Sequence, residues 1–511
     1  MSTEVLIVGA GPSGLALALW LTRLGIRVRI IDRSPSSGLA SRAFALQART
    51  LEFYDQIGIA RDAIGRGRPI AAINVRFTGE RSQPIAIGDF GRGFSPFPFV
   101  LILLQDSHEK LLIDHLGAAG VRVEWNTELI DLTLGADGVR AQLKGPGAAD
   151  QVCEAAYLCG CDGAGSSVRA LCDIGFPGDS SGEIFYVADV EAQGPVVDGG
   201  LHYVMSSEHL CSIFPLKGEH RVRLIGLVPK AVRQAQFRIG FDDVRQAIER
   251  ETGLQVQVLE AFATYRVHQR IASEWRKGRA FLLGDAAHVH SPAGGLGLNA
   301  GVGDAVNLAW KLAAVLRGAA AESLLDTYQG ERMAAARQIA ATTDWGFALQ
   351  ARHGPAMSFA RWALTRLTPT LFRLGAFRHL AFRTLSQLAI DYRGVGSCAG
   401  EAGGVAGGDR LPWIRLNGQA DNFAGLKGLG WQAHVYGEAE PRLRQACAAW
   451  GLALQAFPWI AAMGRAGLMR NAVYLIRPDG YVAYAGPTQA PEALGEQLAR
   501  FAIVAAPRPG G

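Results

Sequence analysis

Several features that would indicate other classes of protein are missing from this chain. No apolar stretch reaches the roughly 18 to 20 uncharged residues that a transmembrane helix requires, and the run at residues 15–21 is too short. No basic segment followed by a cleavage site stands at the N-terminus, so secretion is not expected. We therefore expect a cytoplasmic protein without stable membrane insertion.

Signals for nucleic-acid and metal binding are missing as well. The 51 basic and 46 acidic side chains give a net charge of only +5, and they form no run of Lys or Arg. The seven cysteines are an odd number without zinc-type pairing, and only Cys159 and Cys161 stand close together. No His-x-Glu-x-x-His pattern occurs. We expect structural thiols in a reducing compartment, no metal and no nucleic-acid partner.

The length and composition favour a folded protein with large cores. Its 511 residues suffice for about three domains by the usual size range. Hydrophobic residues make up 49% of the chain and charged residues 19%, so disorder is not the expected state.

A nucleotide-binding motif opens the chain. Residues 5–8 form an apolar run typical of a buried parallel strand, followed directly by GAGPSG at 9–14, a G-x-G-x-x-G loop. A helix-like segment then ends at Gly25, before a second apolar strand at 28–31. In such a unit the first glycine permits a tight turn, the second lets the backbone approach a pyrophosphate, and the third lets helix pack on strand. The helix N-terminus then faces the phosphates.

Asp32 indicates which nucleotide this unit favours. It closes the second strand 18 residues after Gly14, where a carboxylate can accept hydrogen bonds from both ribose hydroxyls. That position suits an adenosine ribose without a 2′-phosphate. By itself the glycine pattern is also compatible with an ordinary Gly-rich turn, and it does not distinguish FAD from NAD.

Two further stretches carry longer motifs. The first is CGCDGAGSSVR at residues 159–169, which follows a strand-like segment. The second is GRAFLLGDAAH at 278–288, which continues through SPAGGLGLN at 291–299 to DAVNLAWK at 304–311. Together with the first motif, these stretches resemble the class A flavoprotein monooxygenases, the aromatic hydroxylase family. The resemblance favours FAD as the bound nucleotide.

The resemblance covers most of residues 3–340, and its motifs have a physical interpretation. A strand at 280–283 ends at Gly284 and Asp285, where the acid can hydrogen-bond a ribityl hydroxyl. Free backbone amides at 294–299, at the start of a helix, can stabilise negative charge on the flavin N1/O2 edge. The 159–169 segment also has a simpler interpretation, a turn followed by a helix that Ser166 or Ser167 caps.

The resemblance also implies roles for single residues. Arg42 matches a family arginine near the flavin and pyrophosphate, and Gln105 matches a glutamine that contacts FAD. Arg42, which would assist reduction, and Pro292, whose carbonyl would contact the oxygenated flavin, are the candidate catalytic residues. His288 and His290 are more simply structural hydrogen-bonding groups, and no general base is assigned. The expected cofactor contacts are Gly9, Ala10, Gly11, Pro12, Ser13, Gly14, Asp32, Arg33, Arg42, Gln105, Leu129, Asp162, Gly163, Gly284, Asp285, Pro292, Gly295, Gly297, Leu298 and Asn299.

The rest of the chain predicts a sheet and a second α/β unit. Period-two alternation between 181 and 270 indicates antiparallel strands, which in the family cover the substrate above the flavin. Tyr203, Phe214, Phe97 and Phe99 either line that pocket or pack in the core. The expected parts are a discontinuous FAD-binding domain (1–70, 101–180 and 271–340), a substrate-binding sheet domain (71–100 and 181–270), a helical connection (341–398) and a C-terminal domain (399–511).

The C-terminal part resembles the thioredoxin-like domain of some family members. Five glycines within 400–408 predict a linker or domain boundary. The segment beyond contains only Cys447, so dithiol chemistry is not expected. Packing, an oligomer contact or closure of the pocket is expected there instead. The expected fold is therefore α/β: a Rossmann-like FAD-binding domain, an inserted antiparallel substrate sheet and a thioredoxin-like C-terminal domain.

The function implied by the resemblance is aromatic hydroxylation. In the family, NADPH or NADH reduces FAD, O2 forms a flavin C4a-hydroperoxide, and a phenolic or polyketide-like aromatic substrate is hydroxylated. Two alternatives stand: another FAD oxidoreductase (an epoxidase, a Baeyer–Villiger enzyme or a reductase), and an FAD-bearing ligand-binding protein without turnover. Neither a second strand with G-x-G-x-x-G nor the W-x-W-x-I-P signature of flavin halogenases occurs. A monomer and a homodimer are both compatible with the sequence.

Overall fold

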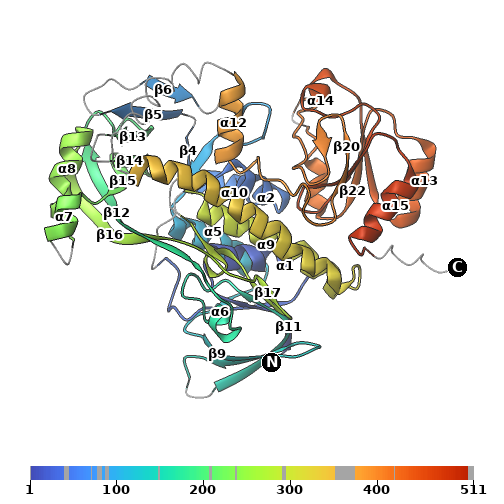
Figure 1. The fold of residues 1–511 in the computed structure, drawn as a ribbon, viewed down its shortest axis with the longest axis horizontal. Helices are drawn as coiled ribbons and strands as arrows, with labels where there is room; N and C mark the ends of the chain where they lie inside the picture. Colours follow the sequence, from blue (N-terminus) through green and yellow to red (C-terminus); the bar gives the residue numbers. More distant parts are fainter. Residues whose placement is uncertain are drawn as a thin grey trace.

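Three large sheets, of eight, eight and six strands, organise the part of the chain that the structure describes, and a small fourth sheet is formed by β3 (Ala45–Leu46), β7 (Val100–Ile102) and β4 (Arg68–Ile70). In the computed structural model (Figure 1), the first sheet lies at the bottom, the second at the upper left and the third in the C-terminal part at the right. The described residues are 2–38, 45–70, 72–77, 83–86, 91–147, 150–205, 210–235, 239–290, 295–351, 375–418 and 420–503.

The first sheet is built around a parallel core of strands that are far apart in sequence. Strand β1 (Ser2–Val8) pairs in parallel with β2 (Val28–Ile31) on one side and with β11 (Asp150–Gly160) on the other. Strands β18 (Ala280–Leu282) and β8 (Val123–Glu124) extend it outward, again in parallel. A parallel sheet with both faces covered needs apolar strands, and the last four residues of β1 are buried. Antiparallel strands β9 (Glu128–Leu134), β10 (Val139–Lys144) and β17 (Arg276–Lys277) complete the sheet.

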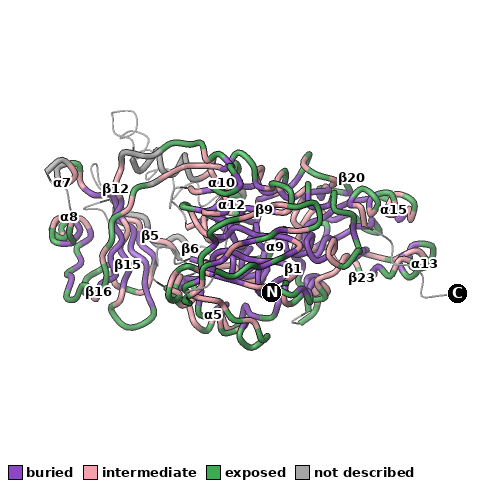
Figure 2. The backbone as a smooth tube through the Cα atoms, turned by 90° about the horizontal axis from the view of Figure 1, so that it is seen from below, coloured by how far each residue is buried: buried purple, intermediate pink, exposed green. Residues whose placement is uncertain are grey.

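Two helices on this sheet determine where the motifs lie. Helix α1 (Pro12–Arg23) is buried from Gly14 to Leu21 because it packs against both the sheet and α9 (Gly297–Leu316). In Figure 2 the buried backbone is concentrated around β1 and α9. The amino ends of α1 and α9 carry the first and last of the sequence motifs. Helices α2 (Ala48–Gln56), α3 (Ala60–Arg66), α5 (Gln105–Ala118) and α6 (Ser167–Leu171) complete this body.

The second sheet is almost wholly antiparallel, as the period-two alternation predicts. Its two longest strands, β12 (Gly178–Gln193) and β16 (Gln255–Ile271), pair along most of their length. Strand β5 (Ala72–Phe77) joins through the one parallel pairing of this sheet among the described residues, with β13 (Leu201–Met205). The other strands are β6 (Gln83–Ala86), β14 (Leu210–Pro215), β15 (Arg221–Leu227) and β19 (His288–Val289).

The two faces of this sheet have different neighbours. Tyr186 and Ala188 of β12 belong to a buried cluster that helix α8 (Asp242–Thr252) completes. Phe185 and Leu227 lie in a separate cluster with Ile225 and Tyr265. Ile225 also packs beside Phe214 and beside Ala45 and Ile102 of the first body. One face of the sheet is therefore aromatic and turned toward the nucleotide-binding body.

The C-terminal part forms a mixed α/β sheet of its own, with strand order β21-β20-β25-β24-β22-β23. The prediction of a linker at 400–408 is wrong, because β20 (Ala399–Ala402) and β21 (Val405–Ala406) pair there as a hairpin. Gly403 occupies its turn with φ +68°, a conformation that glycine adopts without strain. The other elements are β22 (Gln432–Tyr436), α13 (Pro441–Trp450), β23 (Ala453–Phe457), α14 (Ala461–Arg465), β24 (Val473–Ile476), β25 (Val482–Gly486) and α15 (Pro491–Arg500).

Two helices connect the C-terminal part to the rest, α10 (Asp326–Ala351) and α12 (Gly375–Leu385). None of the helices in the described ranges has the length and apolar character to cross a lipid bilayer. The α/β fold with an antiparallel second sheet is confirmed, while the exact domain bounds stay predictions.

The C-terminal part shares its core with the nucleotide-binding body. One continuous buried cluster contains Val5 and Trp310 as well as Val435, Leu475 and Leu494 of the third sheet. Charged side chains are also buried at this junction: Glu331 of α10 is fully buried and paired with Arg477, which follows β24. The two parts are therefore one folding unit at this seam.

Removal of residues 399–511 is expected to prevent the remaining chain from folding. It would expose the apolar side of α9 and remove Arg477 from Glu331, which would keep Lys311 as a partner, and breaking a buried ion pair by removing one partner costs about 3–5 kcal/mol. The soluble fraction and the thermal unfolding curve of the 1–398 chain, compared with the full chain, measure this. A soluble 1–398 chain with a cooperative transition would contradict the shared core.

Candidate active site

A cleft of about 250 Å³ lies at the carboxyl ends of β1 and β2, where a parallel sheet places its nucleotide. Segments from five parts of the chain meet there, including Trp125 and Thr127, which the sequence analysis did not single out. Nine of the expected cofactor contacts line the cleft, namely Gly9, Ala10, Gly11, Asp32, Arg33, Gln105, Leu129, Asp162 and Gly163.

The three glycines of the loop have different roles: two are required by the packing of the protein itself, and the third leaves room for a ligand. Gly9 has φ +104°, and a Cβ there would lie 2.3 Å from the carbonyl oxygen of Cys161. A Cβ on Gly14 would lie 2.0 Å from the carbonyl oxygen of Gly9. A Cβ on Gly11 would meet nothing within 4 Å. Only the middle glycine therefore faces open space, which fits a pyrophosphate against the backbone.

The amino end of α1 has the properties of an anion-binding site. Its first position is Pro12, which lacks an N–H, and the N-cap residue Gly11 offers no side chain to the free amides. The positive end of the helix dipole thus faces the cleft without a protein partner. Ser13, by contrast, is packed: Cβ atoms on Gly284 and Gly301 would lie 2.4 and 2.2 Å from its Oγ.

Asp32 is oriented by two backbone amides. Its Oδ2 accepts a hydrogen bond from the N–H of Ala10 at 2.7 Å, and its Oδ1 accepts one from Ser34 at 2.8 Å. A carboxylate has about four acceptor sites, so each oxygen retains capacity for a ribose hydroxyl. The carboxylate also ties the glycine loop to the end of β2.

Gln105 is held by a buried acid that the sequence analysis missed. Its Nε2 donates to Glu109 Oε1 at 2.8 Å, and Glu109 Oε2 accepts from the N–H of Gly38 at 2.9 Å. Burial raises the pKa of Glu109, and the nearby charges of Asp32 and Asp106 add to the shift. The spacing of Gln105 and Glu109, four residues apart on one helix face, was the available signal.

The Asp162 segment is both cleft wall and helix cap. Asp162 accepts hydrogen bonds from Ser166 Oγ at 2.5 Å and from the N–H of Val168 at 3.1 Å. Ser166 in turn accepts from the N–H of Arg169, so the capped-helix interpretation is confirmed with Ser166 as the N-cap. Burial raises the pKa of Asp162. Gly163, at φ +78°, presents its backbone to the cleft.

The turn at Gly284 is held by Asp304 of α9. The N–H of Gly284, which has φ +57°, donates to Asp304 Oδ2 at 3.0 Å. His288 Nε2 lies 2.7 Å from the same oxygen, and Arg332 Nε donates to Oδ1 at 2.7 Å. Burial alone would raise the pKa of Asp304, but Arg332 and His288 lower it to about 2. Asp285 follows on the same turn and is exposed.

Asn299 fixes the amino end of α9 with its side chain. Its Oδ1 accepts from the N–H of Gln47 at 2.8 Å and from Thr50 Oγ1 at 2.7 Å, and its Nδ2 donates to the carbonyls of Ala45 and Gly295. All four positions of the amide are used, so any cofactor contact here comes from the backbone.

Of the other residues expected at the cofactor site, some lie in the described part of the chain and some lie outside it. Gly295, at φ +63°, precedes α9, while Gly297 and Leu298 lie in its first turn, which no side chain caps. Arg42 and Pro292, the two candidate catalytic residues, lie outside the described residues, so their roles stay predictions.

The two histidines beside the turn behave as structural groups. His288 is fully buried, paired with Asp304 and stacked on Trp275 at a ring distance of 5.0 Å. Burial, with a smaller effect of His288, lowers the pKa of His290 to about 3, so its imidazole stays neutral at neutral pH. No cluster of three His, Cys, Asp or Glu side chains that could bind a metal occurs in the described ranges.

Comparison with known proteins identifies the family. A model of the FAD-binding domain matches residues 2–343, and a model of the aromatic-ring hydroxylase C-terminal domain matches 406–503. The chain belongs to the FAD-dependent aromatic-ring hydroxylases. The predicted family, the FAD cofactor and the monooxygenase class are thereby confirmed.

Individual relatives match from about four fifths to nearly all of this hydroxylase. A 6-methylpretetramide 4-monooxygenase of Streptomyces rimosus is 35% identical over 79% of this chain and 72% of its own length. A dialkyldecalin synthase of Streptomyces rugosporus is 31% identical over 96% and 98%.

Two solved structures show the same fold from end to end. OxyS anhydrotetracycline hydroxylase from Streptomyces rimosus superposes with a TM-score of 0.80 at 28% identity, covering 99% of this chain and 100% of its own. Aklavinone-11 hydroxylase, solved with FAD and aklavinone, gives 0.77 at 26%, covering 98% and 99%.

Gly11→Ala and Gly9→Ala are expected to separate cofactor binding from folding. The new methyl group at position 11 enters open space, so the apoprotein should keep its melting temperature while FAD binds about tenfold more weakly or worse. The methyl group at position 9 meets the backbone of Cys161, so the apoprotein itself should melt lower. Apoprotein melting and FAD titration measure both effects. Unchanged FAD affinity of G11A would place the pyrophosphate elsewhere.

Asp304 should contribute stability that acid removes. Its pKa is lowered from 3.8 to about 2 in the folded protein, so its contribution is present above about pH 4 and is lost as the pH falls toward 2. The difference in free energy of unfolding between wild type and Asp304→Asn should therefore be smaller at about pH 3 than at about pH 6. Denaturant titrations at both pH values measure it. An equal difference at both would show that the charge of Asp304 is not what stabilises the turn.

Proposed function

We propose that the protein uses NADPH or NADH and O2 to hydroxylate a phenolic aromatic compound with fused rings. The observation that carries this proposal is the single cleft that joins the α1 loop, Asp32 and the Asp162 segment, with the Gly284 turn and the α9 amino end held beside it. FAD supplies hydride acceptance and oxygen transfer when bound. The protein contributes binding, orientation and exclusion of water.

The aromatic face of the second sheet supports a flat substrate. Phe185 stacks on Tyr265 with ring centroids 5.8 Å apart, and Tyr203 meets Phe214 edge to face at 6.2 Å. Apolar walls with aromatic rings bury planar ligands well and leave orientation to few polar groups. Phe97 and Phe99 instead contact each other and pack against the main core, as the simpler interpretation proposed.

Several relatives are named for fused-ring substrates, and one, a pentachlorophenol 4-monooxygenase of Sphingobium chlorophenolicum that is 32% identical over 81% of this chain, is named for a single-ring phenol. The anhydrotetracycline hydroxylase and the aklavinone hydroxylase share this chain's fold from end to end, and the pretetramide monooxygenase is 35% identical over 79% of the chain. We infer the same substrate class here, a polyketide-like polycycle with at least one phenolic ring. Activation of the ring would depend on the substrate's own hydroxyl, because His288 is engaged by Asp304 and burial lowers the pKa of His290 to about 3, which makes its imidazole a weak base.

A second function deserves a test because one full-length relative is a dialkyldecalin synthase. In this alternative, the nucleotide of the present chain would be part of the fold and no reductant would be consumed. The aromatic face of the second sheet would then bind an organic substrate without oxygenation.

The deciding experiment is consumption of NADPH and NADH by the FAD-loaded protein in air, with a panel of phenols and polycyclic aromatics. We expect consumption to rise with a polycyclic phenol and an equal amount of hydroxylated product to appear. Consumption that yields only hydrogen peroxide identifies an unproductive ligand. Tight binding of polycycles without any reduction of FAD would contradict the hydroxylase and favour the non-redox function.

A further inference from the structure

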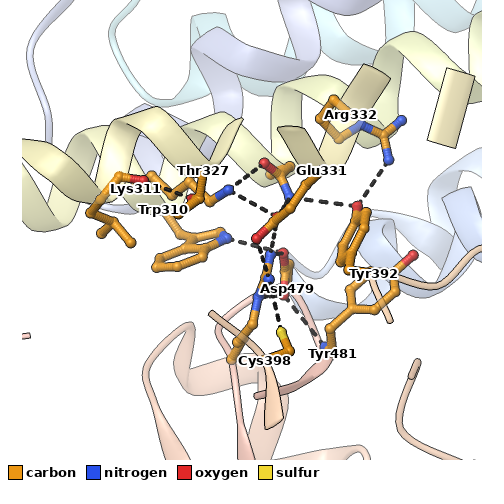
Figure 3. Close-up of polar contacts among 12 residues, drawn as sticks. Trp310, Lys311, Thr327, Glu331, Arg332, Tyr392, Cys398, Asp479 and Tyr481 are labelled. Carbon is orange, nitrogen blue, oxygen red and sulfur yellow. Dashed lines mark hydrogen bonds and ion pairs between the residues drawn. The ribbon is translucent and has the colours of Figure 1, made fainter. Parts of the chain in front are cut away.

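A turn of the C-terminal domain, residues 478–480, contacts two helices of the FAD-binding body at once. Trp310 Nε1 of α9 donates to Asp479 Oδ2 at 3.0 Å, and Arg49 of α2 donates to the backbone carbonyl of Asp479 at 2.7 Å. Asp479 is 1% exposed, and Figure 3 shows it between Trp310 and the C-terminal strands. The contact is therefore polar, buried and directional.

A chain of ion pairs leads from Asp479 back to α9. Arg477 donates to both oxygens of Asp479, at 3.1 and 2.6 Å, and to both oxygens of Glu331, at 2.8 and 2.9 Å. Glu331 also accepts from Lys311 Nζ at 2.9 Å and from Asn307 Nδ2 at 2.7 Å. These contacts begin at Trp310 of α9 and end at Asn307 and Lys311 of the same helix, within about one helical turn. They therefore hold the middle of α9 in place (Figure 3).

The charges in this path compensate one another. Two cations, Lys311 and Arg477, meet two anions, Glu331 and Asp479, and all four side chains are at most 2% exposed. Burial alone would raise the pKa of Glu331, but Arg477 and Lys311 lower it to about 2, so it remains charged. Removing one member leaves a net charge in an apolar site, which the helix can relieve only by shifting or by admitting water.

Two further sets of hydrogen bonds connect these ion pairs to the cofactor cleft. Arg332 follows Glu331 on α10 and binds Asp304, which holds the N–H of Gly284. On the other side, Thr50 follows Arg49 on α2 and binds Asn299 at the start of α9.

We propose that Asp479 is a positioning residue for the flavin site: it fixes α9 along its axis and thereby sets the amino end of α9 against the Gly284 turn. Trp310 lies 13 residues after Gly297, about 20 Å along the helix at 1.5 Å per residue. The C-terminal domain thus acts on the cofactor without touching it. This inference rests on the proposed function only in that FAD occupies the cleft.

The test compares Asp479→Asn and Trp310→Phe with a matched control. D479N keeps the size of the side chain but removes its charge, and W310F removes the N–H donor while every charge stays paired. The control is Asn422→Ala. Asn422 is 0% exposed in the same domain, and its side chain forms hydrogen bonds with Ile414, Pro412 and Tyr436, all outside α9. All three variants should melt lower than wild type.

The readouts are FAD affinity by titration of the apoprotein, the visible circular dichroism of bound flavin and its reduction potential. We expect D479N and W310F to bind FAD about tenfold more weakly and to change the flavin dichroism and potential. N422A should retain wild-type values for all three.

Loss of melting temperature in D479N and W310F with wild-type FAD affinity, dichroism and potential would overturn the proposal and leave Asp479 a purely structural residue. W310F decides alone if D479N fails to fold. These readouts need no substrate, so a wild-type protein that binds FAD but forms no oxygenated product would contradict the proposed function and not this coupling.

Discussion

The buried pairing of Glu331 with Arg477 is the interaction on which the arrangement of this protein depends. The two residues lie 146 positions apart, on α10 and at the end of β24, and both are fully buried. Each charge has one further partner, Lys311 for Glu331 and Asp479 for Arg477, but breaking a buried ion pair is costly, so the docked C-terminal sheet stabilises the middle of α9. The C-terminal domain, for which the sequence analysis left packing, an oligomer contact and pocket closure open, packs into the same core as the FAD-binding body.

Helix α9 joins the cofactor site to this pairing. Its first turn carries uncapped amides, its second presents Asp304 to the Gly284 turn, and its middle meets Glu331 and Asp479. The motif at residues 304–311 therefore has two structural roles, and the sequence alone does not show which residues serve which role. Asp304 holds the Gly284 turn, while Trp310 binds Asp479 of the C-terminal domain and Asn307 and Lys311 bind Glu331, the partner of Arg477.

Sequence patterns predicted the parts of the site whose residues lie within a few positions of one another. The G-x-G-x-x-G loop, Asp32 and the strand before them predict a cleft because glycine geometry and parallel pairing act over a few residues. Partners could not be predicted where pairing joins distant segments, as for Gly38 with Glu109 or Arg477 with Glu331. The glycines at 400–408 misled for the same reason: their strand partner, β25, lies some 80 residues further along the chain.

Labelling with ¹⁸O2 tests the central claim most directly. The FAD-loaded protein would be supplied with NADPH, labelled oxygen and the polycyclic phenol that best stimulates reduction, and the product analysed by mass spectrometry. We predict one labelled oxygen atom per molecule of product, bonded to an aromatic ring. A product without label, or a product formed equally well without reductant, would contradict the assignment as a hydroxylase.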